Sequence, residues 1–131
     1  MPEGLAFTVH VIDDDEAVRE SLEALLVVAG FDVTTYASAE AYLEGDPRDG
    51  CVLVDVHMPG MGGLELLRLL AGREPPVPVV VLTASRETRL RERALGLGAR
   101  AFLSKPVPEA MLLDTLHAVD KGNRLRWANR T

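Results

Sequence analysis

Short apolar runs alternate with longer amphipathic segments along most of the chain. The apolar or alternating runs predict strands at residues 9–12, 31–36, 51–54, 77–82 and 101–103. Apolar residues at helical spacing predict helices over 16–29 and 108–120, and three more around Tyr42, Leu67 and Ala94. Because strands and helices alternate strictly, the chain is predicted to form an α/β fold with a parallel sheet covered on both faces.

Four residues are predicted to mark the ends of these helices. Ser38 and Ser85 precede apolar periodic segments and are expected to act as N-terminal caps. Gly30 and Gly98 follow such segments and are expected at C-terminal ends, where the backbone turns left-handed.

Length and composition limit this pattern to one globular domain. The chain has 131 residues, of which 47% are apolar and 26% charged. We assign 1–7 to an N-terminal arm, 8–121 to the domain and 122–131 to a C-terminal tail or linker. That last segment is basic, and its sequence leaves open a helix extension, a linker or a docking tail.

Charge and hydropathy exclude several classes of protein. A formal net charge of −6 argues against direct nucleic acid binding by this domain. No segment reaches the roughly 18 apolar residues of a membrane span, and the N-terminus does not resemble a signal peptide, so we expect a cytoplasmic protein with no membrane contact. The single cysteine, Cys51, lies in an apolar run and is predicted to be a buried, inert thiol.

Polar side chains follow four of the five predicted strands. They are Asp13, Asp14, Asp55, Thr83 and Lys105. In parallel α/β sheets, ligands bind at the carboxyl ends of the strands, so we expect these groups to lie close together. Carboxylates, a hydroxyl and an ammonium are the groups needed to hold a divalent cation and a phosphoryl group.

Charge repulsion within this set favours a bound cation. Two carboxylates about 4 Å apart repel each other by about 4 kcal/mol at an effective dielectric of about 20. Mg²⁺ prefers oxygen ligands and takes one or two protein carboxylates, which Asp14 and Asp55 can supply. A simpler interpretation holds for single residues, since Asp15 or Glu16 alone is typical of an exposed helix start. It does not account for the whole set.

Four motifs, in order and in spacing, resemble those of response regulator receiver domains from residue 9 to about residue 119. They are 11–15 (VIDDD), 53–63 (LVDVHMPGMGG), 81–84 (VLTA) and 102–106 (FLSKP). The resemblance implies a flavodoxin-like (βα)5 fold, a doubly wound five-stranded parallel sheet with strand order 2-1-3-4-5. Residues 38–43 (SAEAYL) and 58–61 (MPGM) look most like the FixJ-type branch. Members of that branch often carry a helix-turn-helix output domain, which we do not expect within these residues.

The resemblance also implies a role for each site residue. Asp55 would be the phosphoacceptor, and Asp13 and Asp14 would hold Mg²⁺ with Asp55 and the backbone carbonyl of His57. Thr83 would bind the phosphoryl group, Lys105 would neutralise another of its oxygens, and the rotamer of Phe102 would follow Thr83. The bond between Lys105 and Pro106 would be cis, which is accessible to an X-Pro bond.

Partners follow from the same resemblance. The phosphoryl donor would be a cognate histidine kinase or a phosphotransfer protein. The surface formed by residues 85–97, 101–103 and 108–120 is a possible homodimer or partner interface, although its charged helix face is equally typical of solvent exposure. The domain would be a signalling phosphoacceptor that supports its own phosphotransfer and dephosphorylation rather than an enzyme.

The side chains of the three histidines and of one serine have no part in these roles. His57 and Ser85 occupy variable positions near the phosphoryl group, and the sequence does not give their effect. A hard, oxygen-ligated Mg²⁺ site has no use for the imidazole of His57. His10 and His117 show no metal-binding spacing and are predicted to be packing or surface residues.

Three other functions fit less of the sequence. A phosphatase of the haloacid dehalogenase type would need a second acidic pair on a strand after Lys105, where the remaining acids lie on a predicted helix. A flavodoxin-like carrier would need a phosphate-cradling loop where this chain has Asp13, Asp14 and Asp15. A pseudo-receiver, a binding module that switches without phosphate, would ordinarily lack one or more of the key residues.

Overall fold

The computed structural model describes residues 7–129, with side chains described through residue 122. Within that range, strands and helices alternate as predicted. Their bounds are β1 (Thr8–Ile12), α1 (Glu16–Val28), β2 (Asp32–Tyr36), α2 (Ala39–Gly45), β3 (Cys51–Val54), α3 (Gly63–Ala71), β4 (Val79–Thr83), α4 (Thr88–Gly96), β5 (Ala101–Ser104) and α5 (Glu109–Asn129). The alternating hydrophobic pattern therefore predicted every element of the described chain.

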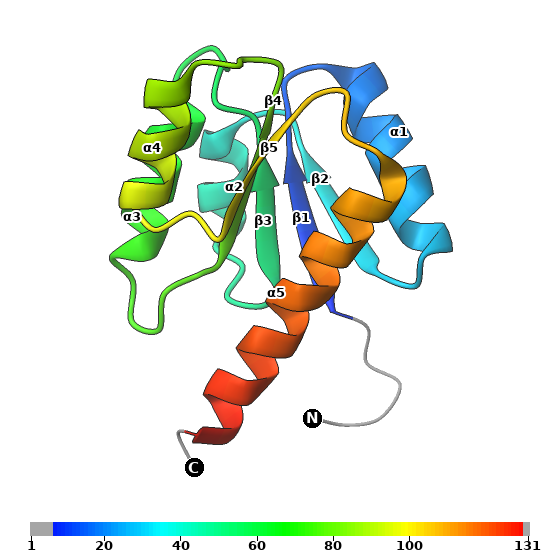
Figure 1. Cartoon of the computed structure of the whole chain (residues 1–131), viewed down its shortest axis with the longest axis vertical. Coiled ribbons are helices and arrows are strands. Elements are labelled where there is room, and N and C mark those ends of the chain that lie inside the picture. Colours follow the sequence, from blue (N-terminus) through cyan, green and yellow to red (C-terminus); the bar gives the residue numbers. More distant parts are fainter. Residues whose placement is uncertain (1–6, 130–131) are drawn as a thin grey trace.

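The five strands form one parallel sheet in the order β2-β1-β3-β4-β5. This confirms the flavodoxin-like order 2-1-3-4-5. Helices α1 and α5 cover one face, and α2, α3 and α4 cover the other (Figure 1). The carboxyl ends of β1, β3, β4 and β5 consequently meet at one edge of the sheet.

Alternate residues of each strand point to opposite faces and fill two hydrophobic clusters. Val52 and Val54 of β3 pack in the cluster under α2, α3 and α4. Cys51 and Leu53 pack in the cluster under α1 and α5. All four side chains are at most 1% exposed, and full burial of one Val or Leu stabilises a fold by about 1.5–3 kcal/mol. β3 is thus buried on both faces, which holds the residue that follows it firmly in place.

Cys51 is buried, as predicted. Its exposure is 0%, and burial raises the pKa of the thiol to about 12. Very little thiolate, the reactive form, is present at neutral pH.

The predicted helix ends are right in three of four positions. The Ser38 hydroxyl accepts a hydrogen bond from the backbone N–H of Ala41 at 3.0 Å. Gly30 and Gly98 have φ angles of 98° and 109°, in the left-handed region that glycine adopts without strain. The prediction that Ser85 caps the fourth helix is wrong, because α4 begins three residues later at Thr88. Ser85 is held in the preceding loop instead, where its N–H donates to the Thr83 hydroxyl.

Besides the start of α4, two element boundaries differ from the predicted ones by more than one residue. β4 begins at Val79 rather than at residue 77, because Pro78 has no N–H to donate to the sheet. The carbonyl of Pro78 still accepts a hydrogen bond from Val52 N at 2.9 Å. α5 continues past residue 120 to Asn129, so the backbone through most of the predicted tail is a helix extension. Figure 1 shows this end of α5 projecting from the sheet edge opposite the carboxyl ends of the strands.

The Lys105–Pro106 bond is cis, as the resemblance implied. The Glu74–Pro75 bond is also cis, which was not predicted.

The predicted N-terminal arm lies mostly outside the described residues, since residues 1–6 are not described. Phe7, its last residue, is buried, and its ring packs edge-on against Phe31. No helix in the described range is long and apolar enough to cross a membrane. The cytoplasmic location stays a prediction.

His10 and His117, predicted to be packing or surface residues, are one of each: His10 is buried and His117 lies at the surface. His10 is 3% exposed and its ring nitrogens lie 3.1 Å from the Tyr36 hydroxyl and 3.0 Å from the Asp49 carbonyl. His117 is exposed, and its ring centroid lies 4.9 Å from that of Phe31. Neither lies among the site residues.

Candidate functional site

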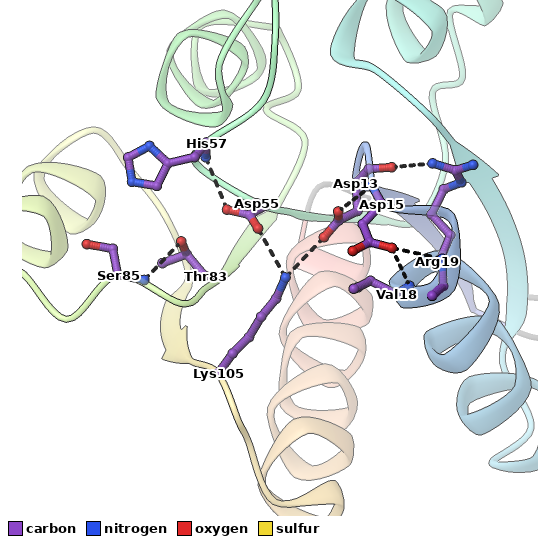
Figure 2. A network of polar contacts seen from close by, with 10 residues as sticks. Asp13, Asp15, Val18, Arg19, Asp55, His57, Thr83, Ser85 and Lys105 are labelled. Carbon is purple, nitrogen blue, oxygen red and sulfur yellow. Dashed lines mark hydrogen bonds and ion pairs between the residues drawn. The ribbon is translucent and has the colours of Figure 1, made fainter.

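The carboxyl ends of four strands deliver the predicted side chains to one edge of the sheet. Asp13 follows β1, Asp55 follows β3, Thr83 ends β4, and Lys105 follows β5. Residues as far apart in sequence as Asp13 and Lys105 are therefore neighbours in space. Figure 2 shows the ammonium of Lys105 between the carboxylates of Asp13 and Asp55.

Lys105 joins the two carboxylates in one charged network. Its Nζ donates to Asp55 Oδ2 at 3.0 Å and to Asp13 Oδ2 at 3.1 Å. The side chains of Asp13, Asp55 and Lys105 are 5%, 14% and 24% exposed. Two carboxylates share one ammonium, so the three groups together carry one net negative charge. Asp55 is the more accessible of the two acids.

The other carboxylate oxygens are held by backbone N–H groups. Asp13 Oδ1 accepts a hydrogen bond from Asp15 N at 2.9 Å, and Asp55 Oδ1 accepts one from His57 N at 3.1 Å. Since a carboxylate oxygen has two lone pairs, each retains an acceptor position after these contacts. His57 contributes its backbone here, and its imidazole points away from Asp55 (Figure 2).

The backbone around the network is fixed by contacts between elements. Lys105 N donates to the Thr83 carbonyl at 2.8 Å, and Asp55 N donates to the Ile12 carbonyl at 3.3 Å. Arg19, from α1, donates its Nη1 to the Asp13 carbonyl at 2.7 Å. Sequence reasoning missed Arg19, and the only sequence signal for it is a basic residue placed early in the helix that follows the acidic loop.

The pKa of Lys105 reflects both burial and its partners. Burial alone would lower the pKa of the ammonium. Hydrogen bonds and charge attraction from Asp55 and Asp13 outweigh it, so the pKa is raised above its usual 10.5. Lys105 is therefore charged throughout the neutral range.

Thr83 and Phe102 lie on the same face of the sheet. Phe102 pairs with Val81 in the β4–β5 register and shares a cluster with it, and Thr83 is two residues beyond Val81. Thr83 is 1% exposed and Phe102 is 6% exposed. The Phe102 ring thus packs inward in this structure. The outward rotamer, from which the ring could turn inward when Thr83 moves, is not seen here.

One arginine of the charged face of α4 contacts β5. Arg91 Nη1 donates to the Phe102 carbonyl at 3.3 Å. The charged face is thus not wholly solvated, since this side chain ties α4 to the strand that carries Phe102.

Asp14 and Asp15, both in the β1–α1 loop, differ in their contacts. Asp15 caps α1, and its Oδ1 accepts hydrogen bonds from Ala17 N and Val18 N. Asp14 is exposed. In the described part of the chain no three acidic, histidine or cysteine side chains gather as a metal site. The structure thus brings Asp13 and Asp55 together, and the role of Asp14 as a ligand stays a prediction.

Comparison with known proteins gives the family directly. Residues 9–117 match the response regulator receiver domain family. The chain belongs to that family. This confirms the resemblance drawn from the four motifs, and it leaves the phosphatase and flavodoxin-like interpretations without support.

The receiver domain is similar to regulators of the FixJ type. It is 48% identical over 120 residues to the transcriptional regulatory protein FixJ of Azorhizobium caulinodans, covering 90% of this chain and 56% of that protein. It is 42% identical over 106 residues to FixJ of Bradyrhizobium diazoefficiens, covering 79% and 52%. These matches support the FixJ-type branch. The chain spans about half the length of these curated relatives.

Solved structures agree with the sequence matches. The response regulator StyR superposes with a TM-score of 0.86 at 39% identity, covering 95% of this chain and 64% of that one. FixJ-N superposes with a TM-score of 0.78 at 35% identity, covering 89% and 93%. The receiver domain thus shares its fold with domains of two-component systems.

Proposed function

We propose that Asp55 of this receiver domain accepts a phosphoryl group from a histidine kinase or a phosphotransfer protein, and that Mg²⁺ is required. The observation that carries the proposal is the contact of Lys105 with both Asp13 and Asp55. It brings a nucleophilic carboxylate, a second acid and a cation to one accessible point. In the reaction, a carboxylate oxygen of Asp55 forms a bond to phosphorus as the bond to the donor's imidazole nitrogen breaks, which leaves an acyl phosphate.

The chemistry of the donor set fits Mg²⁺. Asp13 and Asp55 present only oxygens, and the net negative charge of their network with Lys105 favours a divalent cation. Asp13, Asp14, Asp55 and the His57 carbonyl would hold the ion. When bound, Mg²⁺ would neutralise charge that develops on the phosphoryl oxygens.

Lys105 and Thr83 would stabilise the phosphoryl group once it is attached. Lys105 is charged at neutral pH and already contacts Asp55, so its ammonium can follow the new negative charge. The Thr83 hydroxyl can donate to a second phosphoryl oxygen. The same residues would support loss of the phosphoryl group to water, which makes the domain a self-limiting switch.

The curated relatives indicate the kind of output that a receiver domain of this type controls. The relatives are named transcriptional regulatory proteins, and each is about twice as long as the matched region. We assign to this receiver domain the control of a similar output, through the surface of α4, β5 and α5. Formation of a homodimer through this surface would be one way for the domain to act on that output.

A mass measurement tests the proposed reaction. The protein is incubated with acetyl phosphate in the presence of Mg²⁺ or of EDTA, and its intact mass is recorded. A single phosphoryl adduct that is labile to acid and appears only with Mg²⁺ is expected. An acid-stable adduct, or one of equal yield in EDTA, contradicts the proposal.

The neighbouring acids Asp14 and Asp15 should separate metal binding from stability. Asp14→Ala should weaken Mg²⁺ binding and leave the unfolding free energy nearly unchanged. Asp15→Ala removes the cap of α1 and should lower the unfolding free energy by about 1 kcal/mol, with little change in Mg²⁺ affinity. A metal titration and urea denaturation of both variants measure the two quantities. Equal losses of Mg²⁺ affinity would refute the distinct role of Asp14.

Thr83→Ala should uncouple phosphorylation from the α4, β5 and α5 surface. A charge-assisted hydrogen bond contributes about 1.5–3 kcal/mol, enough to shift a two-state equilibrium about tenfold or more. Asp55 should still be phosphorylated in the variant. Amide NMR with and without a phosphoryl mimic should show shift changes around Phe102 in the wild type only. Wild-type changes in the variant would rule out this coupling.

A further inference from the structure

Two sequence segments that resemble the FixJ-type branch, residues 38–43 and 58–61, are in contact in the structure. The carboxylate of Glu40, in the first turn of α2, accepts a hydrogen bond from the backbone N–H of Met61 at 3.0 Å. Met61 lies in the loop between β3 and α3, and the first residue of this loop is Asp55. A side chain of α2 therefore anchors the loop that leaves the phosphoacceptor.

The loop is shaped to receive this carboxylate. Gly60 has a φ angle of 76°, and a Cβ built on it would lie 2.5 Å from Glu40 Oε2. A Cβ at this position would push the end of the Glu40 side chain out of its contact, and the left-handed φ by itself favours glycine. The Met61 hydrogen bond also lowers the pKa of Glu40, so the group that accepts the bond is the charged carboxylate at neutral pH.

Further contacts tie the loop to its surroundings on both sides of His57, so a shift of Met61 would be transmitted to the backbone near Asp55. Gly63 N donates to the Val56 carbonyl at 3.0 Å and closes the base of the loop. A Cβ on Gly63 would lie 2.3 Å from the Asp55 carbonyl, so α3 begins directly against the phosphoacceptor backbone. The side chains of Met58 and Met61 pack against the core cluster. Between these fixed points lies His57, whose carbonyl belongs to the proposed Mg²⁺ site.

We propose that Glu40 is a positioning residue for the Mg²⁺ site, which it acts on by holding the β3–α3 loop through Met61. The inference rests on the proposed function, since His57 is a ligand only in that account. Glu40 does not touch the acidic site residues in this structure. It sets where the loop, and with it the His57 carbonyl, stands relative to Asp55 and Asp13. Partners that orient metal ligands in this way contribute strongly to metal affinity in other sites.

Three substitutions at Glu40 separate the effect of its side-chain length from the effect of its charge. Glu40→Asp keeps the charge and shortens the side chain by one methylene, so the bond to Met61 is lost. Glu40→Gln removes the charge and keeps an oxygen acceptor at the same reach. Glu40→Ala removes both. Glu44→Ala, at an exposed position four residues along the same helix, is the control for loss of charge alone.

Two readouts are measured on the unphosphorylated protein. Hydrogen exchange at the Met61 amide, recorded without metal, reports the contact itself. NMR titration with Mg²⁺ reports the affinity of the site. In Glu40→Asp and Glu40→Ala, exchange at Met61 should accelerate and the Mg²⁺ dissociation constant should rise about three- to tenfold, below the range for a partner bonded to the ligand itself, because Glu40 bonds to Met61 and not to His57. Glu40→Gln should stay within about twofold of the wild type, because its amide oxygen still accepts the bond. Glu44→Ala should match the wild type.

The outcomes distinguish this inference from the proposed function. If Met61 exchanges faster in Glu40→Asp while Mg²⁺ binds as in the wild type, the contact does not position the site and the inference is overturned. Equal weakening in Glu40→Gln and Glu44→Ala would assign the effect to charge and also overturn it. If the wild type shows no Mg²⁺-dependent shifts around Asp55, the proposed function itself fails. Thermal unfolding of each variant confirms that the fold is retained in the comparison.

Discussion

Replacing Asp55 with asparagine is expected to abolish the phosphoryl adduct and leave the fold intact. Asparagine has nearly the same shape, and its side-chain oxygen can still accept from His57 N or Lys105. It cannot form an acyl phosphate. The side chain of the remaining acid of the network, Asp13, is only 5% exposed and is held by both Lys105 and Asp15. The adduct yield should therefore fall below about 1% of the wild type, as expected when a nucleophile is removed.

The measurement is intact mass after incubation with acetyl phosphate and Mg²⁺. Asp114→Asn, at an exposed acid on α5, is the matched control and should be phosphorylated normally. Circular dichroism of Asp55→Asn should match the wild type. A persistent acid-labile adduct in Asp55→Asn would move the phosphoacceptor to another residue.

Replacing Lys105 with methionine is expected to make stability depend strongly on Mg²⁺. The substitution leaves the carboxylates of Asp13 and Asp55 close together with no ammonium between them. Breaking a buried ion pair costs about 3–5 kcal/mol, and the partial exposure of Lys105 reduces this to about 1–3 kcal/mol. A divalent cation can replace the lost charge, so Mg²⁺ should stabilise the variant more than the wild type.

Urea denaturation with and without Mg²⁺ measures this difference, with Lys121→Met at an exposed position as control. The pH range is set by the raised pKa of Lys105. Its contribution to stability is full below the unfolded value of 10.5 and is lost as the pH rises through the higher folded value. The gap between wild type and variant should therefore stay constant from about pH 7 to 9 and narrow above about pH 10.5. An equal effect of Mg²⁺ on both proteins would contradict the charge balance described for the site.

The sequence predicted the fold because its apolar pattern is regular. β3 shows this most clearly, since Cys51 to Val54 form a continuous apolar run and are buried on both faces. Asp55 could be predicted to lie at a site because parallel strands place their carboxyl ends together. The same rule identified Asp13, Thr83 and Lys105 without any knowledge of their distances.

Other parts of the site depend on packing that no periodicity encodes. Arg19, Glu40 and Arg91 each bond to a backbone group in another element or loop. Such contacts arise only once the elements are assembled, so a single sequence gives no direct sign of them. For Ser85 the local sequence predicted a contact that the assembled fold does not make, the cap of α4. Its hydroxyl accepts a hydrogen bond from Glu87 N at 3.4 Å within the loop, a local contact that serine side chains also favour in turns, and α4 begins only after Glu87.

Chemical location of the phosphoryl group tests whether Asp55 carries it. The protein is phosphorylated with acetyl phosphate and Mg²⁺, the acyl phosphate is reduced with borohydride to convert the modified aspartate into homoserine, and the digest is mapped by tandem mass spectrometry. We expect homoserine at Asp55 alone, and none when EDTA replaces Mg²⁺. Homoserine at Asp13 or Asp14, or its appearance at Asp55 without Mg²⁺, would contradict the role of Asp55 as the Mg²⁺-dependent phosphoacceptor.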